Sequence, residues 1–158
     1  MSLEKAAPMP ILPPFTVSIS SSEMAVRDAL KQVLTALDPL ELGVEEAGTV
    51  ELVLAEALNN VVEHAYPEAE GTISIACAHK LDGLHLRIVD KGEAMPDGTT
   101  PLGQLASLDV DFEDLPEGGF GWFLIRDLAK DVLYRRVGSE NQLSMRLAVA
   151  LQTDGPRH

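Results

Sequence analysis

Three polar residues with chemically useful side chains recur four positions apart in one segment of the sequence: Glu56, Asn60 and His64. Each such step advances only about 40° around a helix of 3.6 residues per turn, so a helix would place all three side chains in one narrow stripe. A carboxylate there can accept a proton from a hydroxyl or water, and an amide oxygen can join phosphates and waters around Mg²⁺. The pattern also fits a solvated helix face, but the surrounding apolar residues indicate that the stripe borders a core.

A second candidate site follows an apolar run at Asp90-Lys-Gly-Glu-Ala-Met-Pro. A carboxylate at the end of a strand can accept a hydrogen bond from an exocyclic amine. Gly92, two residues later, would let a flat ring approach the backbone closely. An ordinary turn has the same residues, because Asp-x-Gly is a common turn sequence.

The third candidate is glycine-rich, Glu117-Gly-Gly-Phe-Gly-Trp, and it precedes an apolar helical pattern. The free amides and the dipole of a helix N-terminus attract anions, and Gly118, Gly119 and Gly121 would let phosphates come close to the backbone. A flexible hinge is the alternative. The segment is not a P-loop, because the Gly-Lys-Ser/Thr of that motif is missing.

The elements that must position these residues can be predicted from periodicity, turn residues and prolines. Apolar periodicity predicts three helices, and short alternating or apolar runs predict five strands. Asp82-Gly83 indicates a hairpin between the second and third strands. Residues 92–119 have no sustained period and are interpreted as a lid over a site. The predicted strands are 15–20, 72–78, 84–89, 132–137 and 142–150, and the predicted helices are 23–37, 45–65 and 121–130.

This order of elements predicts an α+β fold, a two-layer sandwich in which helices cover one face of a mixed, mostly antiparallel sheet. A doubly wound Rossmann fold is disfavoured because crossover βαβ units are missing. The chain of 158 residues suits one domain, here residues 15–151, with a proline-rich extended arm at 1–14 and a tail at 152–158.

Composition excludes several classes of function. The formal net charge of −13 gives the wrong long-range field for sequence-independent nucleic-acid binding or for an anionic membrane surface. No apolar run approaches the roughly 20 residues that span a bilayer, so a cytoplasmic location is expected. Cys77 is the only cysteine, which rules out an intrachain disulfide, and its apolar surroundings indicate a small buried hydrophobic residue.

In their order, EALNNVVEHAY, VDKGEAMP and EGGFGWFLI resemble the N, G1 and G2 boxes of the GHKL ATPases, the superfamily that includes gyrase B and histidine-kinase catalytic domains. The Glu-x-x-x-Asn-x-x-x-His-Ala-Tyr form and a first helix ending in Leu-Asp-Pro are most similar to the bacterial anti-sigma-factor serine/threonine kinases. The resemblance covers about residues 15–150. It implies a Bergerat-type ATP-binding fold that uses ATP and Mg²⁺.

The resemblance also implies a role for each matching residue. Glu56 would be the general base, Asn60 the Mg²⁺ ligand and His64 a neighbour of the phosphates. Asp90 would bind the adenine amino group. The remaining matches place Gly92 and Met95 in the adenine pocket, Gly118, Gly119 and Gly121 at the phosphates, Ser144 as a hydroxyl near adenine on the last strand, and Arg27 at a contact with protein partners.

Two positions depart from the family pattern. Ala94 replaces the second glycine of the G1 box, and Phe123 stands where some relatives offer a hydroxyl to phosphate. Neither change removes an ionising or metal-binding group. The implied function is an ATP-dependent anti-sigma factor, usually a homodimer, that binds a sigma factor and phosphorylates an antagonist protein on Ser or Thr. The alternative is a non-catalytic, ATP-gated protein-binding switch. The presence of Glu56 favours catalysis, because a switch needs no base.

Overall fold

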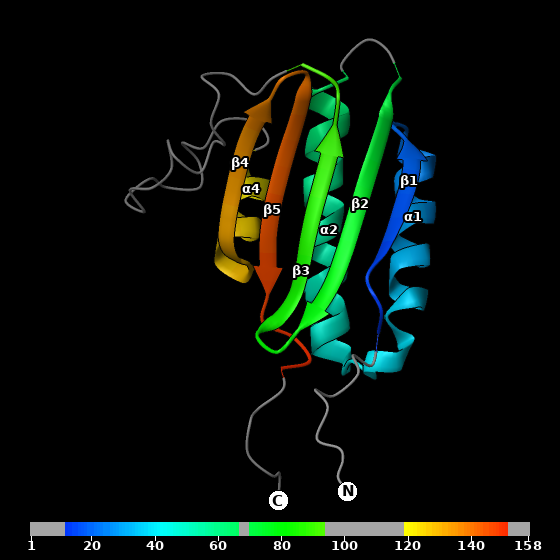
Figure 1. Ribbon diagram of the computed structural model, residues 1–158, viewed down its shortest axis with the longest axis vertical. Coiled ribbons are helices and arrows are strands. Elements are labelled where there is room, and N and C mark those ends of the chain that lie inside the picture. Colours follow the sequence, from blue (N-terminus) through cyan, green and yellow to red (C-terminus); the bar gives the residue numbers. More distant parts are fainter. Residues whose placement is uncertain (1–11, 67–69, 94–118, 152–158) are drawn as a thin grey trace, which may run out of the picture.

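The computed structural model describes residues 12–66, 70–93 and 119–151, without the side chains of 119–123. Figure 1 shows its elements in chain order. The predicted lid falls almost wholly outside the described residues, as do the arm up to residue 11 and the tail from 152. The elements are β1 (Phe15–Ser20), α1 (Glu23–Ala36), a 3₁₀ turn η1 (Asp38–Leu40), α2 (Val44–His64), β2 (Thr72–Lys80), β3 (Gly83–Asp90), α4 (Gly119–Leu128), β4 (Lys130–Val137) and β5 (Glu140–Leu147).

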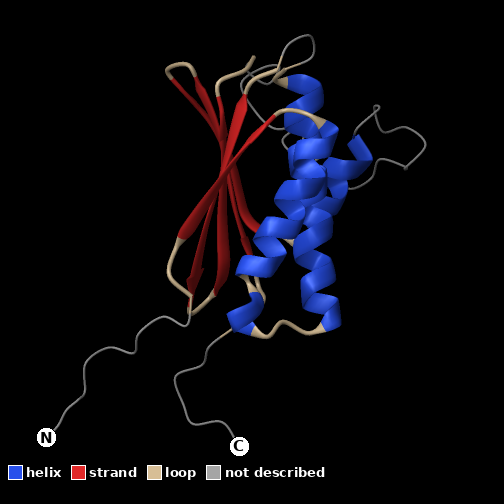
Figure 2. Cartoon of the chain, turned by 90° about the vertical axis from the view of Figure 1, so that its right-hand side faces the viewer, coloured by secondary structure: helices blue, strands red, loops and turns tan. Residues whose placement is uncertain are grey.

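The described strands form one sheet in the order β1-β2-β3-β5-β4. Figure 2 shows the helices gathered on one face of this sheet, so the molecule has two layers. The predicted α+β sandwich is confirmed, with the difference that every pairing among the described strands is antiparallel. The helix predicted at 121–130 begins earlier, at Gly119, and the last two strands also begin two residues before their predicted starts.

Capping side chains and a proline determine where α1 and α2 begin and where α1 ends. Ser22 caps α1 by accepting a hydrogen bond from the amide of Ala25 at 3.1 Å. Pro39 lies in the 3₁₀ turn that follows α1, since proline suits the first turn of a helix but not its interior. Glu46 lies in the first turn of α2, where its carboxylate accepts a hydrogen bond from the Gly43 amide at 3.4 Å. Its negative charge there interacts favourably with the positive end of the helix dipole.

The core lies between α2 and the two central strands of the sheet. The apolar face of α2 buries Val50, Val53, Leu54, Ala57, Leu58 and Val61. It packs against the inner faces of β2 and β3, which contribute Ile73, Ile75, Cys77, Leu84, Leu86 and Ile88. The expected burial of Cys77 is confirmed, and burial raises the pKa of its thiol to about 12, so it stays protonated and unreactive.

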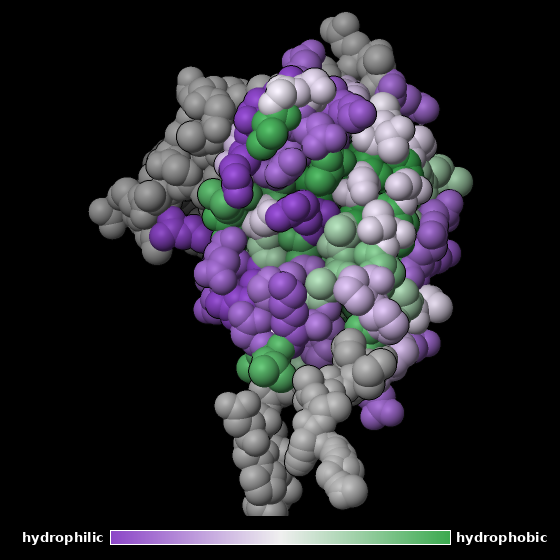
Figure 3. Space-filling model, in the orientation of Figure 1, coloured by the Kyte–Doolittle hydropathy of each residue, from purple (hydrophilic) through white to green (hydrophobic). Residues whose placement is uncertain are grey.

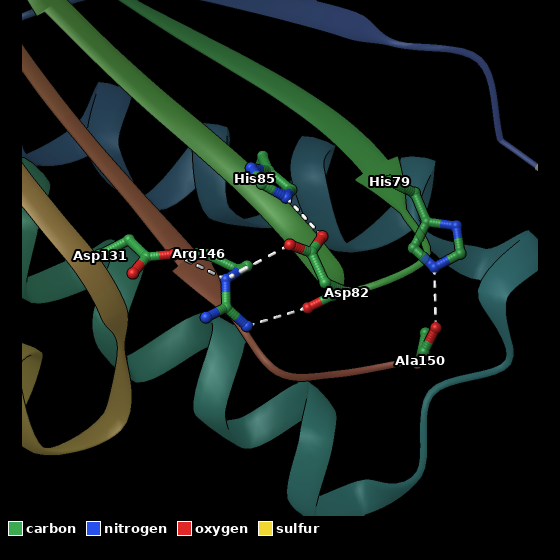
Figure 4. A network of polar contacts seen from close by, with 6 residues as sticks. All are labelled: His79, Asp82, His85, Asp131, Arg146 and Ala150. Atoms are coloured by element: carbon green, nitrogen blue, oxygen red, sulfur yellow. Dashed lines mark hydrogen bonds and ion pairs between the residues drawn. The ribbon is translucent and has the colours of Figure 1, made fainter. Parts of the chain in front are cut away.

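Both ends of the described chain are attached to this core. Leu12 is buried although it belongs to the predicted extended arm, so the folded unit begins before residue 15. At the other end, the amide of Ala150 donates to Glu46 Oε2 at 3.0 Å, and the carbonyl oxygen of Ala150 lies 2.8 Å from His79 Nε2. Figure 4 shows the His79 contact.

The face of the sheet opposite the helices carries mixed polar and apolar side chains (Figure 3). Near the β2–β3 turn, Arg146 Nε lies 2.9 Å from Asp131 Oδ2 and 3.7 Å from Asp82 Oδ2. His85 Nε2 lies 2.7 Å from Asp82 Oδ1 (Figure 4). Contacts this exposed contribute little to stability, because solvent screens them. No helix among the described residues is both long enough and apolar enough to cross a bilayer.

The packing of α2 on the sheet generates a stability prediction. Leu58→Ala removes a fully buried side chain and should lower the free energy of unfolding by about 2–5 kcal/mol. Leu52→Ala is the matched control, because Leu52 lies on the same helix with 39% of its surface exposed. Chemical denaturation measures both, and equal losses would contradict the proposed core.

Candidate functional site

A small cavity lies where β3 ends and β5 begins, beneath the last turns of α2. It is lined by residues that are far apart in the sequence, among them Asn60 and His64 from α2, Asp90 from β3, Tyr134 from β4 and Asn141 from β5. The cavity measures about 20 Å³, enough for a water molecule but not for a larger planar ring. Exposed rim residues such as His64 and Glu93 would have to move before such a ring could enter.

Asn60 is buried, and its side chain is held in one orientation. Its Nδ2 donates to the main-chain carbonyl of Glu56 at 2.7 Å. Its Oδ1 has no donor among the described residues, which is unusual for a buried oxygen. This unpartnered oxygen suits a hard cation such as Mg²⁺. The described part of the chain has no group of three His, Cys, Asp or Glu side chains that could hold a metal.

Asp90 likewise has one side-chain atom with partners and one without, in this case its two oxygens. Oδ1 accepts from the Gly92 amide at 2.8 Å and from Asn141 Nδ2 at 2.7 Å, whereas Oδ2 accepts from no described residue. Burial raises the pKa of Asp90, and the hydrogen bonds from Asn141 and Gly92 and the charge of Arg136 oppose this rise. Two of the residues that line the cavity, Asn60 and Asp90, therefore each have a buried acceptor that a ligand could satisfy.

Asn141 is the residue at this site that the sequence analysis missed. Its Nδ2 donates to Asp90 Oδ1 at 2.7 Å and to the carbonyl of Glu93 at 2.8 Å, and its Oδ1 accepts from Tyr134 Oη at 2.5 Å and Arg136 Nη1 at 3.0 Å. Asn141 is only 4% exposed. One signal in the sequence could have identified it. Asn141 has the same alternation as Leu143 and Met145, which indicates the buried side of the strand, where a polar side chain needs a hydrogen-bond partner.

The turn after β3 packs directly against the end of α2. The amide of Glu93 donates to the carbonyl of Ala65 at 2.9 Å, and the amide of Lys91 donates to Tyr66 Oη at 2.8 Å. A Cβ atom at Gly92 would lie 2.2 Å from the Ala65 carbonyl oxygen. Glycine is therefore required for contact with the helix end, whereas the sequence analysis attributed Gly92 to the approach of a ligand ring.

The structure brings together some of the predicted site residues. Asn60, His64 and Asp90 line the cavity, but Glu56, which is half-buried one turn before Asn60, does not. Gly119 and Gly121 lie in the first turn of α4, where amides have no partner within a helix. Met95 and Gly118 lie outside the described residues.

Two predicted residues lie away from the cavity. Ser144 alternates with the buried Leu143 and Met145, so it belongs to the helix-free face of the sheet and lines a different hollow there. Ser144 was expected near adenine on the last strand, but its side chain is on the face of the sheet opposite to Asp90, so these two residues do not share a cavity. Arg27 is exposed and lines a groove of about 300 Å³ between α1 and α2.

Comparison with known proteins agrees with this geometry. The family described as histidine kinase-like ATPase domain matches residues 19–147. Serine-protein kinase RsbW of Bacillus mycoides is 32% identical over 85 residues, which are 52% of this chain and 52% of the relative, and RsbW of Bacillus cereus matches equally. The chain thus spans about half the length of these curated relatives.

A solved structure supports the fold. The crystal structure of the RsbU and RsbW domains of Rv1364c from Mycobacterium tuberculosis superposes with a TM-score of 0.60 at 16% identity. The match covers 90% of this chain and 35% of that one. At this identity the likeness establishes the shared fold alone.

The close contact at Gly92 generates the second prediction. In Gly92→Ala, the added methyl group meets the main chain of Ala65, so the turn or the helix end must shift, at a cost of about 1–3 kcal/mol in the free energy of unfolding. Gly48→Ala, with open space around its Cβ inside α2, should instead stabilise by about 0.5–1 kcal/mol. Thermal and chemical denaturation measure both, and a neutral Gly92→Ala would disprove the contact.

The buried carboxylate generates the third prediction, on pH. Because the pKa of Asp90 is raised in the folded protein, its stabilising contribution is present at low pH and is lost as pH rises through that pKa. Asn at position 90 can still accept both hydrogen bonds at Oδ1 without carrying a charge. Asp90→Asn should therefore be at least as stable as the wild type at pH 7, and its advantage should shrink as pH falls. Denaturation across pH measures this, and an advantage that grows at low pH would contradict it.

Proposed function

Because the chain belongs to the histidine kinase-like ATPase domain family and is related to the RsbW kinases, we propose that it is an ATP-dependent anti-sigma factor with serine/threonine protein kinase activity. It would bind a sigma factor and phosphorylate an antagonist protein on Ser or Thr, in the cytoplasm and as a homodimer. The observation that carries the proposal is the pair of buried, unpartnered acceptors in one cavity, Asn60 Oδ1 and Asp90 Oδ2.

The two acceptors suit opposite ends of a nucleotide. Asp90 Oδ2 accepts a hydrogen bond from the adenine amino group, and Asn60 Oδ1 offers a ligand at the phosphate end. Mg²⁺, when bound with ATP, neutralises charge on the phosphate oxygens. The exposed His64, one turn beyond Asn60, lines the same cavity and would be a neighbour of the phosphates.

Glu56 is proposed as the general base. The hydrogen bond from Asn60 Nδ2 to the carbonyl of Glu56 fixes these two neighbours relative to each other. Glu56 is half-buried, so its carboxylate reaches solvent, from which an acceptor hydroxyl arrives. It would orient that hydroxyl and take its proton as the phosphoryl group is transferred.

The remaining sequence predictions complete the proposal. The segment 92–119 would act as a lid, and the amides of Gly118, Gly119 and Gly121 would bind phosphates at the N-terminus of α4. Met95 would line the adenine pocket. Arg27, beside the groove between α1 and α2, would contact a protein partner.

A second candidate function is a non-catalytic switch in which ATP only changes the affinity for a protein partner. One observation favours it: Glu56 is not among the residues that line the cavity. The two functions differ in whether a phosphoryl group reaches the bound partner.

The fourth prediction separates these functions. Glu56→Gln keeps the shape of the side chain but cannot accept a proton, so phosphoryl transfer should fall by roughly 10²–10⁴ while ATP affinity is unchanged. Asn60→Ala removes the proposed ligand and should weaken both nucleotide binding and transfer. Glu51→Gln, an exposed carboxylate on the same helix, is the matched control and should change neither.

The assay needs a protein substrate, which a pull-down from native lysate with Mg-ATP supplies. Transfer of labelled phosphate to the recovered protein is then measured, with ATP affinity determined by isothermal titration. Undiminished transfer in Glu56→Gln would exclude Glu56 as the base. Absence of ATP binding by the wild type would overturn both candidate functions, and binding without transfer would leave the switch.

A further inference from the structure

The side chain of Asn141 is held in one orientation by partners from two segments of the chain, residues 90–93 and 134–136. Arg136 has only donors, so the atom of Asn141 that faces it at 3.0 Å must be the oxygen Oδ1. Tyr134 donates to the same oxygen. On the other side of the amide, Asp90 Oδ1 and the Glu93 carbonyl are acceptors, so Nδ2 must face them. The amide cannot turn over without breaking these contacts.

This orientation determines which oxygen of Asp90 faces a ligand. Asp90 Oδ1 receives Asn141 Nδ2 and the Gly92 amide, at 2.7 and 2.8 Å, which leaves Oδ2 as the one acceptor without a donor among the described residues. Burial raises the pKa of Asp90, and the hydrogen bonds from Asn141 and Gly92 and the positive charge of Arg136 oppose this rise. In its ionised form the carboxylate has no proton to donate and can only accept.

We propose that Asn141 is a positioning residue that makes Asp90 selective for nucleotides with a 6-amino group over those with a 6-oxo group. The inference rests on the proposed function, which supplies the nucleotide. A 6-amino group donates to Oδ2, whereas a 6-oxo group presents a second acceptor to it. A site built around one buried hydrogen bond rejects a ligand that leaves the bond unmade.

Without Asn141 the carboxyl group would keep only the Gly92 donor. It could then rotate, present either oxygen to the cavity, and take up a proton to become a donor. A protonated carboxyl group can bind a 6-oxo group, so discrimination between the two bases would be lost. A residue that supported only the packing of the cavity would affect both nucleotides equally.

The test compares Mg-ATP with Mg-ITP by isothermal titration. The base of ITP has an oxo group at position 6 and a proton on N1, where adenine has an amino group and an unprotonated N1. The wild type should prefer ATP by roughly tenfold or more, the value of one hydrogen bond to a charged acceptor. Asn141→Leu should reduce this preference to about threefold or less. Gln142→Leu, the next residue on the opposite face of β5, should preserve it.

A milder variant keeps the test decisive if Asn141→Leu does not fold. Arg136→Met removes one donor to Asn141 from an exposed rim position and should lower the ATP preference roughly two- to tenfold. Arg135→Met, the adjacent arginine whose side chain belongs to the opposite face of β4, is its control. Both variants are checked by thermal denaturation.

The outcomes separate this inference from the proposed function. A wild type that binds both nucleotides equally, or variants that weaken both equally, would overturn the role of Asn141 and leave ATP binding intact. Loss of preference in the Asn141 and Arg136 variants alone would support it. A wild type that binds neither nucleotide would overturn the proposed function, and this inference with it.

Discussion

The hydrogen bond between Asn141 and Asp90 connects the parts of the candidate site that come from the sheet. Asp90 is the last residue of β3 and Asn141 the second residue of β5, so this 2.7 Å contact connects the neighbouring ends of two strands. Through Asn141 it reaches Tyr134 and Arg136 of β4, and through Gly92 it reaches the helix end at Ala65. A buried carboxylate needs such donors, because burial without them costs several kcal/mol.

The layers of the fold could be predicted because each signal was local. Helices α1 and α2 were indicated by apolar residues at helical spacing and by a proline after the C-terminal end of each helix, Pro39 and Pro67. Asp82-Gly83 indicated the β2–β3 hairpin, which the structure closes with a positive φ at Gly83. The stripe on α2 was also predictable, since helical spacing alone placed Asn60 and His64 on one side, and both line the cavity.

The site could be predicted only in part, because its partners come from distant segments. Nothing local connects Asn141 with Asp90, which lies 51 residues away. Ser144 shows a different failure: Leu143, Met145 and Leu147 already indicated the buried side of β5, so Ser144 had to face the other way. A match to a family pattern was preferred there over the alternation of the strand itself. Gly92 was identified correctly as a required glycine, but for a contact with helix α2 that sequence cannot show.

The strand order β1-β2-β3-β5-β4 has a consequence for how the protein folds. The hairpins β2–β3 and β4–β5 are each local and can form early, whereas β3 meets β5 only after the long intervening chain has closed, an entropic cost that rises with loop length. Asp90 and Asn141 lie on opposite sides of that last seam. A partly folded chain with both hairpins intact and β3 still apart from β5 would therefore have no site, so ligand binding reports that these two strands have paired.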